Sequence, residues 1–310
     1  MTGLAASPGP ASSRPTSSRP ASSAPDPQTC GLSSNSRDLP RKFDAEAKVC
    51  GDTTDEPPTS PAPTADEPAL TEVQQERYVR NTSVIGIGDE GQRRLLASSV
   101  LVIGAGGLGS AALPYLAAAG IGRIGIVDGD VVELKNMQRQ VLHTELGRNK
   151  AESAAERLRL LNPDVTVDVF PEYLTAEAAP ALFAGYDLVM DCCDTFAAKF
   201  LISDACRVAE RPLVWATAVG MQGQCSVFGV PDQYGDRLWL RDLIPVEPDL
   251  DDYPRATEIG VLGAMVGQIG SLEATEAVKY LAGFGDLLVG RVMVLDALRG
   301  RWSVLPLRRA

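Results

Sequence analysis

The sequence predicts an α/β fold in which a doubly wound, mainly parallel sheet ends in antiparallel strands. Three observations predict it. Runs of Val, Ile and Leu alternate with amphipathic stretches of helical length, which is typical of strand–helix–strand units. A glycine-rich segment, residues 104–109, lies between the first such run and the first such helix. Two short apolar runs at 291–295 and 302–307 close the chain and are spaced as a hairpin.

The first elements follow in a regular order. A charged stretch over residues 77–96 predicts a short helical arm that leads into the fold. Residues 99–103 are expected to be the first strand, and the glycine segment then opens an alanine-rich helix that runs to Ala119. A second strand over 124–127 ends at Asp128. These elements make one complete Rossmann-like βαβ unit.

Strands and helices keep alternating after this unit. We expect helices over 149–161, 176–183 and 196–209, and strands over 165–169, 188–190, 213–216 and 225–230. Residues 231–254 carry six aspartates and little periodicity, which predicts a long functional loop. A helical pattern with many small residues returns over 258–281.

The composition divides the chain unevenly. Of the 310 residues, the first 70 hold 12 of the 22 prolines, 11 serines and one aromatic side chain, Phe43. Such a segment buries too little apolar surface to offset the entropy of ordering, so we expect residues 1–70 to be a disordered tail. An over-extended start site or a solvated arm explains it better than a targeting role. Residues 71–310 are expected to be the folded domain.

Charge and cysteine content exclude several classes of function. The formal net charge is −11, whereas nucleic-acid-binding proteins are usually basic, so we expect no nucleic-acid partner. The six cysteines show neither a CxxC pair nor a regular spacing, which fits reduced thiols in the cytoplasm. No apolar run reaches the ~20 residues of a membrane span, so we expect no membrane association.

The glycine segment predicts a nucleotide-binding site. Gly104, Gly106, Gly107 and Gly109 let the backbone approach a phosphate and present the N–H groups of the following helix to it. Asp128 and Asp130 lie about 20 residues downstream, where an acidic side chain accepts hydrogen bonds from ribose hydroxyls. An NAD-dependent dehydrogenase and an ATP-using enzyme both fit this pattern.

Amides and two cations follow the second strand. Asn136, Gln138 and Arg139 lie just past it and Lys150 begins the next helix, so both cations can converge on a phosphate chain above the glycine segment. A triphosphate needs such cations and a dehydrogenase does not. An equally weighted alternative is that Arg139 and Lys150 are ordinary solvated charges.

Two aspartates follow the strand at 188–190, at the edge where open α/β sheets bind ligands. Asp194 lies further beyond the strand than Asp191, and it is better placed to hold Mg²⁺ against phosphate oxygens. For Asp191 a helix cap or a buried structural role is favoured. His143 is the only histidine, and we expect a structural role for it, which weakens the dehydrogenase alternative.

Eight segments together carry a resemblance to a known family. They are RYVRN at 77–81, GAGGLG at 104–109, DGD at 128–130, NMQRQ at 136–140, Lys150, DCCD at 191–194, GMQGQ at 220–224 and GSLEATEA at 270–277. From residue 77 to the C-terminus the chain resembles the ThiF/MoeB/HesA family of carrier-protein adenylyltransferases, which are relatives of the ubiquitin-activating enzymes.

The resemblance implies an activity. Family members are homodimers that use ATP and Mg²⁺ to adenylylate the C-terminal Gly-Gly carboxylate of a ubiquitin-like sulfur carrier of the MoaD or ThiS type, for molybdopterin or thiamine biosynthesis. It implies a nucleotide half at about 98–210 and a carrier-binding half at about 211–310. Arg80 resembles the arginine that reaches across the dimer to the terminal phosphate, and Thr195 stands beside Asp194 where relatives often carry Asn.

The sequence also departs from the family pattern. The two CxxC pairs that bind zinc in many relatives are absent, so we expect no zinc. Ala256 aligns where some relatives have a reactive cysteine, so a covalent transfer step is not supported. The C-terminal rhodanese domain of some relatives is also missing, and we expect a separate sulfur donor.

Three alternatives stay open. The chain could activate another carboxylate or a tRNA-linked group. It could instead be a non-catalytic adaptor that binds ATP or carrier, although it retains Arg80, Arg139, Lys150 and Asp194. An NAD-dependent oxidoreductase is the most distant alternative.

Overall fold

The computed structural model describes residues 69–248 and 259–307. The predicted tail falls outside this part of the chain except for its last two residues. Leu70 is buried, and its carbonyl accepts a hydrogen bond of 3.0 Å from the Gln75 side chain. Leu70 therefore belongs to the folded part rather than to the tail.

An eight-stranded sheet organises the described residues, in the order β3-β2-β1-β4-β5-β6-β7-β8. The strands are β1 (Ser99–Ile103), β2 (Arg123–Val127), β3 (Thr166–Phe170), β4 (Leu188–Asp191), β5 (Leu213–Val219), β6 (Gln222–Phe228), β7 (Arg291–Asp296) and β8 (Arg301–Pro306). β3, β2, β1, β4 and β5 are parallel, and β6, β7 and β8 continue the sheet antiparallel. The predicted α/β sheet with a closing hairpin is confirmed.

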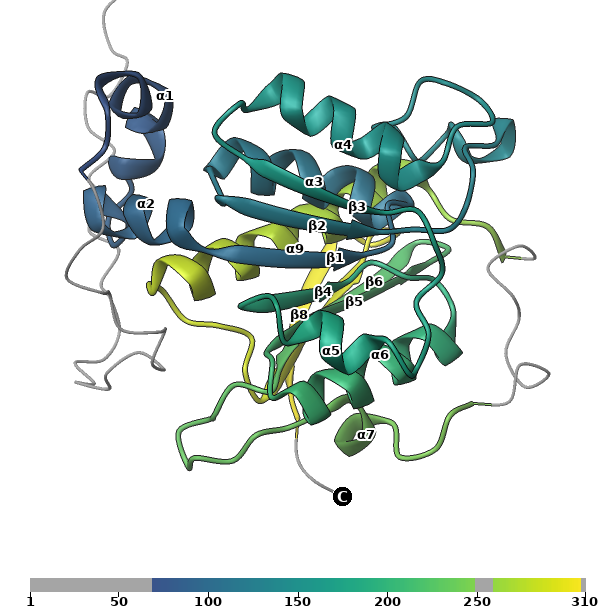
Figure 1. Cartoon of the computed structure of the whole chain (residues 1–310). Coiled ribbons are helices and arrows are strands. Elements are labelled where there is room, and N and C mark those ends of the chain that lie inside the picture. The colour runs from purple at the N-terminus through teal and green to yellow at the C-terminus, as the bar shows by residue number, and fades with distance from the viewer. Residues whose placement is uncertain (1–68, 249–258, 308–310) are drawn as a thin grey trace, which may run out of the picture. The chain divides into compact units, whose positions relative to one another are not determined.

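Helices cover both faces of the sheet (Figure 1). They are α1 (Glu72–Thr82), α2 (Gly88–Ala97), α3 (Gly107–Ala119), α4 (Lys150–Leu161), α5 (Ala179–Phe183), α6 (Phe196–Ala209), α7 (Leu240–Leu243) and α9 (Gly263–Ala282), with a 3₁₀ turn, η1, at Leu134–Asn136. Apolar side chains of α3, α4 and α9 share one core with the sheet, and those of α5, α6 and α7 share the other. The predicted nucleotide and carrier halves therefore contribute to one continuous sheet.

Several predicted boundaries were wrong for local reasons. The single arm at 77–96 is two helices, because Gly86 with a φ of +97° breaks the chain between α1 and α2. The helix expected from 258 begins only at Gly263, after Gly260 with a φ of +75°. The helix expected from 176 begins at Ala179 with Pro180 in its first turn.

The segment at 231–254 is also more ordered than expected over its described part. Leu238, Trp239 and Leu240 are buried, and α7 packs near α6. Trp239 fits against Gly229, where a Cβ atom would come within 2.7 Å of the indole ring. Residues 238–240 therefore belong to the core that α5, α6 and α7 share with the sheet. The acidic residues at 249–254 lie outside the described residues.

Candidate active site

The glycine loop lies at the carboxyl end of β1 and opens α3. Gly104 has a φ of +99°, and a Cβ there would stand 2.8 Å from the Cys192 carbonyl oxygen, so only glycine fits. The N-cap of α3 is Gly106, which has no side chain to bond the first N–H groups of the helix. Those groups are therefore available to an anionic ligand.

Asp128 is tied directly to the glycine loop. Its Oδ2 atom accepts a hydrogen bond of 2.7 Å from the N–H of Ala105, and its Oδ1 atom accepts one of 2.9 Å from the N–H of Asp130. Burial raises the pKa of Asp128, against the lowering effect of these two backbone hydrogen bonds. The predicted ribose acceptor is thus held at the end of β2, beside the loop.

Lys150 is a buried cation paired with Asp130, not an ordinary solvated charge. Its Nζ atom lies 2.7 Å from Asp130 Oδ2, and its side chain is 6% exposed. The Tyr173 hydroxyl donates to the other oxygen of Asp130 at 2.5 Å. Burial alone would raise the pKa of Asp130, but these two hydrogen bonds together with the charges of Lys150 and Lys135 outweigh it and lower that pKa.

Arg139 lies beside the glycine loop. A Cβ atom on Gly107 would stand 3.5 Å from Arg139 Cγ, so the arginine stem passes over the first residue of α3. Asn136 is buried in η1 and Gln138 is exposed. The structure therefore places the Arg139 stem beside the glycine loop and Lys150 on Asp130, and their contact with phosphates stays a prediction.

Gln140 is a site residue that the sequence reasoning missed. It is 3% exposed, and a Cβ on Gly106 would stand 3.6 Å from its Nε2 atom. Its Oε1 atom is buried and has no hydrogen-bond partner among the residues described. The sequence feature that could have identified Gln140 is its place in the NMQRQ motif, two residues after Gln138.

His143 is structural, as expected. Its Nε2 atom lies 2.7 Å from the Ala105 carbonyl oxygen, and its Nδ1 atom lies 3.0 Å from Ser153 Oγ. Burial lowers the pKa of His143, so the neutral ring links α4 to the glycine loop. Both ring nitrogens are already occupied, which leaves none for acid–base chemistry on a nicotinamide.

The two aspartates after β4 have different environments. Asp191 is fully buried and pairs with Lys199, which confirms the structural role expected for it. Asp194 is exposed, and among the described residues its carboxylate has no hydrogen bond or ion pair. Thr195 caps α6 by accepting from the N–H of Ala198 at 3.3 Å, so neither aspartate is the cap. The Thr195 hydroxyl keeps its own proton to donate.

Arg80 is the predicted site residue that the structure does not bring to the others. Its neighbour Tyr78 packs at Gly120, and the Tyr78 hydroxyl bonds Asp164 and Asn162 at the amino ends of β2 and β3. The glycine loop lies at the opposite, carboxyl end of the strands (Figure 1). Arg80 is exposed there, away from the glycine loop of its own chain.

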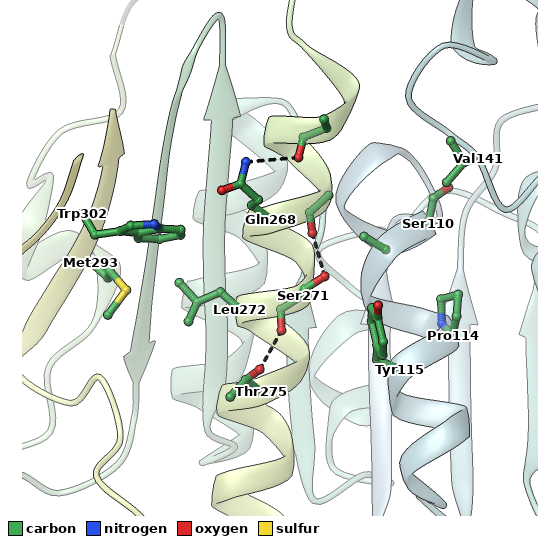
Figure 2. Close-up of a pocket in the computed structure, with 13 residues that line it drawn as sticks. Ser110, Pro114, Tyr115, Val141, Gln268, Ser271, Leu272, Thr275, Met293 and Trp302 are labelled. Carbon is green, nitrogen blue, oxygen red and sulfur yellow. Dashed lines mark hydrogen bonds between the residues drawn. The ribbon is translucent and has the colours of Figure 1, made fainter. Parts of the chain in front are cut away.

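An open groove over α3 and α9, bordered by β7 and β8, is distinct from this site (Figure 2). It has a volume of about 750 Å³ and is lined by Ser110, Ala111, Pro114, Tyr115, Val141, Ala264, Gly267, Gln268, Ser271, Leu272, Thr275, Met293 and Trp302. None of these side chains is charged, so the groove cannot neutralise a triphosphate. The surface around the glycine loop stays the predicted nucleotide site.

Comparison with known sequences decides the family. The ThiF family model matches residues 78–310. The chain belongs to the ThiF family. It is 42% identical over 245 residues to a Mycobacterium tuberculosis protein named probable adenylyltransferase/sulfurtransferase MoeZ, a match that covers 78% of this chain and 62% of MoeZ. It is 43% identical over 254 residues to adenylyltransferase and sulfurtransferase MOCS3 of Bos taurus, covering 81% of this chain and 54% of MOCS3.

The chain thus spans little more than half the length of these two relatives. A shorter relative is covered more fully: the sulfur carrier protein adenylyltransferase of Thermus thermophilus is 41% identical over 242 residues, which are 77% of this chain and 89% of that protein. Among solved structures, E. coli MccB with AMPCPP and MccA has a TM-score of 0.67 at 20% identity, over 78% of this chain and 73% of that chain. PaaA has a TM-score of 0.66 at 21% identity, over 81% and 78%. These two likenesses show the same fold.

Two kinds of feature are absent from the part of the chain that the structure describes. Within 69–248 and 259–307, no group of three or more His, Cys, Asp or Glu side chains is arranged to hold a metal ion. No helix in the same ranges is long and apolar enough to cross a membrane.

Proposed function

We propose that this ThiF-family chain is an ATP-dependent adenylyltransferase that activates the C-terminal glycine carboxylate of a ubiquitin-like sulfur-carrier protein. One observation carries the proposal. The glycine loop, Asp128, Arg139, Lys150 and the loop with Asp194 meet at the carboxyl edge of the parallel strands. Two cations beside a helix N-terminus suit a triphosphate.

The reaction requires little covalent chemistry from the protein. A carboxylate oxygen of the carrier attacks the α-phosphorus of ATP, the bond between the α-phosphorus and the bridging oxygen breaks, and pyrophosphate leaves. The products are an acyl-adenylate and pyrophosphate. The enzyme must bring two anions together and neutralise the charge that moves onto pyrophosphate. Arg139 and Lys150 are the cations for that task, and Asp128 would orient the ribose.

Asp194 fits the role of a magnesium ligand. Its carboxylate is exposed, and it follows the Cys192 carbonyl that abuts Gly104. Mg²⁺ in nucleotide sites is usually held by one or two carboxylates together with phosphate oxygens and water, so a single protein carboxylate is sufficient. The bound ion would supply charge neutralisation on the phosphates.

A homodimer would complete the site. Arg80 cannot serve the glycine loop of its own chain, because α1 lies at the amino end of the strands. Apolar side chains flank it on the surface: Val79, Val84 and Ile85 are 49%, 46% and 97% exposed. We infer that a second copy covers this arm and receives Arg80 at its terminal phosphate.

The partners follow from the same proposal. The carrier would be of the MoaD or ThiS type with a C-terminal Gly-Gly, and a separate cytoplasmic sulfur donor would act after the adenylate forms. The names of the MoeZ, MOCS3 and Thermus relatives support carrier adenylylation. The engagement of both His143 nitrogens argues against the NAD-dependent alternative.

Carrier-dependent exchange of labelled pyrophosphate into ATP tests the proposal. Purified protein is incubated with candidate carriers from the same cell, and the Asp194→Ala variant is assayed beside it. Asp204→Ala is the matched control, since Asp204 lies on α6 and makes a surface ion pair with Arg241. We expect exchange with one carrier, retained in the control and lost in Asp194→Ala. ATP binding without exchange for every carrier would instead favour the adaptor.

A further inference from the structure

A buried ion pair lies beneath the loop that carries Asp194. Lys199 Nζ is 3.3 Å from Asp191 Oδ2 and donates a hydrogen bond of 2.6 Å to the Ala216 carbonyl oxygen. The two side chains are 3% and 0% exposed, and the Trp215 ring faces the ammonium at 5.6 Å. Removing two charges from water costs several kcal/mol per ion, and such a pair stabilises a fold no better than well-packed apolar residues. Stabilisation of the fold therefore does not explain this ion pair, so its position in the structure matters more.

The pair joins the two ends of one short loop. Asp191 is the last residue of β4 and Lys199 lies in the first turn of α6, with Asp194 between them. The second carboxylate oxygen of Asp191 accepts a hydrogen bond of 3.0 Å from the N–H of Cys193. At the other end, the backbone N–H of Lys199 donates to the Thr195 carbonyl oxygen at 3.1 Å. One contact thus fixes the residue before Asp194, and another fixes the residue after it.

The same loop also supports the glycine loop. The N–H of Cys192 donates to the Ile103 carbonyl oxygen at 2.9 Å, and a Cβ on Gly104 would stand 2.8 Å from the Cys192 carbonyl oxygen. A shift of the 192–195 loop would therefore move Asp194 relative to the phosphate-binding backbone of α3.

We propose that Lys199 and Asp191 are positioning residues that hold Asp194 against the phosphates of bound ATP. The inference rests on the proposed adenylylation. Asp194 is exposed, and its carboxylate has no hydrogen bond or ion pair within the part of the chain that the structure describes, so the backbone of its loop sets its position. Arg139, Lys150 and Asp128 approach the nucleotide from other segments and do not depend on this pair.

The first test compares exchange kinetics in Lys199→Met, Lys199→Arg and wild type. We expect Lys199→Met to lower kcat about 10- to 100-fold, because small displacements of a catalytic group have effects of this size. The KM for ATP should change less than about threefold, since the other contacts remain. Lys199→Arg, which keeps the charge, should recover part of kcat. An unchanged kcat in folded Lys199→Met would overturn the proposal.

A double-mutant cycle separates positioning from general stability. In an Asp194→Asn background, Lys199→Met should cost little further activity, because its effect passes through Asp194. Fully additive losses would contradict this. In Asp191→Asn/Lys199→Met, which removes both buried charges, the unfolding free energy should recover toward that of wild type while kcat stays low. If Lys199→Met does not fold, Lys199→Arg replaces it in the cycle.

Binding of ATP gives a readout that needs no carrier. Mg²⁺ should tighten ATP binding to wild type, and both Asp194→Asn and Lys199→Met should lose most of that tightening. Absence of exchange in wild type with every carrier would count against the proposed function alone. Retention of the full Mg²⁺ effect in Lys199→Met would count against the positioning role alone.

Discussion

Glu273 is a fully buried carboxyl on α9 whose described hydrogen-bond partner is the Cys192 thiol, 3.7 Å away. Asp191 and Lys199 face it from β4 and α6, and Cys225 faces it from β6. The ammonium of Lys199 is already paired with Asp191. Burial therefore raises the pKa of Glu273 well above its usual range, which favours the protonated form in the folded protein.

Glu273→Gln should stabilise the protein at neutral and alkaline pH. The unfolded chain releases the Glu273 proton above about pH 4.3 whereas the folded chain keeps it, so its contribution to stability is full below that pH and declines as pH rises toward the folded pKa. Glutamine does not titrate. Urea unfolding at pH 8 should show a higher unfolding free energy for Glu273→Gln than for wild type, with little difference between the two near pH 4.

The exposed Glu177→Gln is the control for this measurement and should show no such pH-dependent gain. A Glu273→Gln variant that is equally destabilised at both pH values would mean that the carboxyl is ionised and partnered in the fold.

For individual residues, the sequence predicted which side chains lie near one another, but not which of them form hydrogen bonds or ion pairs. The glycine loop, Asp128, Arg139 and Lys150 were expected at one site because their spacing follows the end of each strand. The structure places Asp128 and Arg139 beside the loop and pairs Lys150 with Asp130. Tyr173, Gln140 and Lys199 were missed. Their positions depend on how β3, η1 and α6 pack in space, which no local pattern encodes.

Among the elements, α9 packs against α3 at unusually close range. A Cβ atom on Gly270 would lie 2.4 Å from the Leu108 carbonyl oxygen, whereas one on Gly267, a turn earlier on the same helix, would meet nothing within 4 Å. The close approach of α9 to α3 therefore requires a glycine at position 270, whereas it does not require one at position 267.

Gly270→Ala should destabilise the protein by about 1 to 3 kcal/mol, the usual cost of overpacking a core. Gly267→Ala is the matched control and should be neutral or stabilising by up to about 1 kcal/mol, because alanine is the better helix former. Thermal unfolding of both variants measures the difference. Equal stability of the two variants would show that α3 and α9 do not approach so closely.

Regular elements were predicted well where their signal was local. β1 has the expected bounds, and α6 and the closing hairpin were expected within a residue or two. The errors fall where tertiary contacts decide, as for Trp239 against Gly229, or where a glycine adopts positive φ, as at Gly86 and Gly260. Neither is visible in hydrophobic periodicity.

For the whole molecule, a homodimer with shared sites predicts a result that a site built from one subunit does not. Arg80→Ala and Asp194→Ala should each be inactive, yet an equimolar mixture allowed to exchange subunits should regain activity. Half of the randomly formed dimers would be mixed, each with one intact site, so the mixture should reach about one quarter of wild-type activity.

Mixing Arg80→Ala with the Arg80→Ala/Asp194→Ala double variant is the control, since it builds no intact site. Recovery of activity in this control, or no recovery in the first mixture despite subunit exchange, would exclude a shared site.

The net charge is also a property of the whole molecule. The proposed reaction joins two anions on a chain of net charge −11, so it would need cations concentrated at the site, and Arg139 beside Gly107 and Lys150 paired with Asp130 are the candidates.

The most direct measurement follows the carboxylate oxygen. A carrier whose C-terminal carboxylate is labelled with ¹⁸O is incubated with the protein, ATP and Mg²⁺, and the acyl-adenylate is then cleaved by a nucleophile that attacks its carbonyl carbon. Attack of the carboxylate on the α-phosphorus leaves one labelled oxygen on AMP, and mass spectrometry of the AMP should detect it. Unlabelled AMP, or ADP in place of AMP and pyrophosphate, would contradict the adenylylation proposed for this chain.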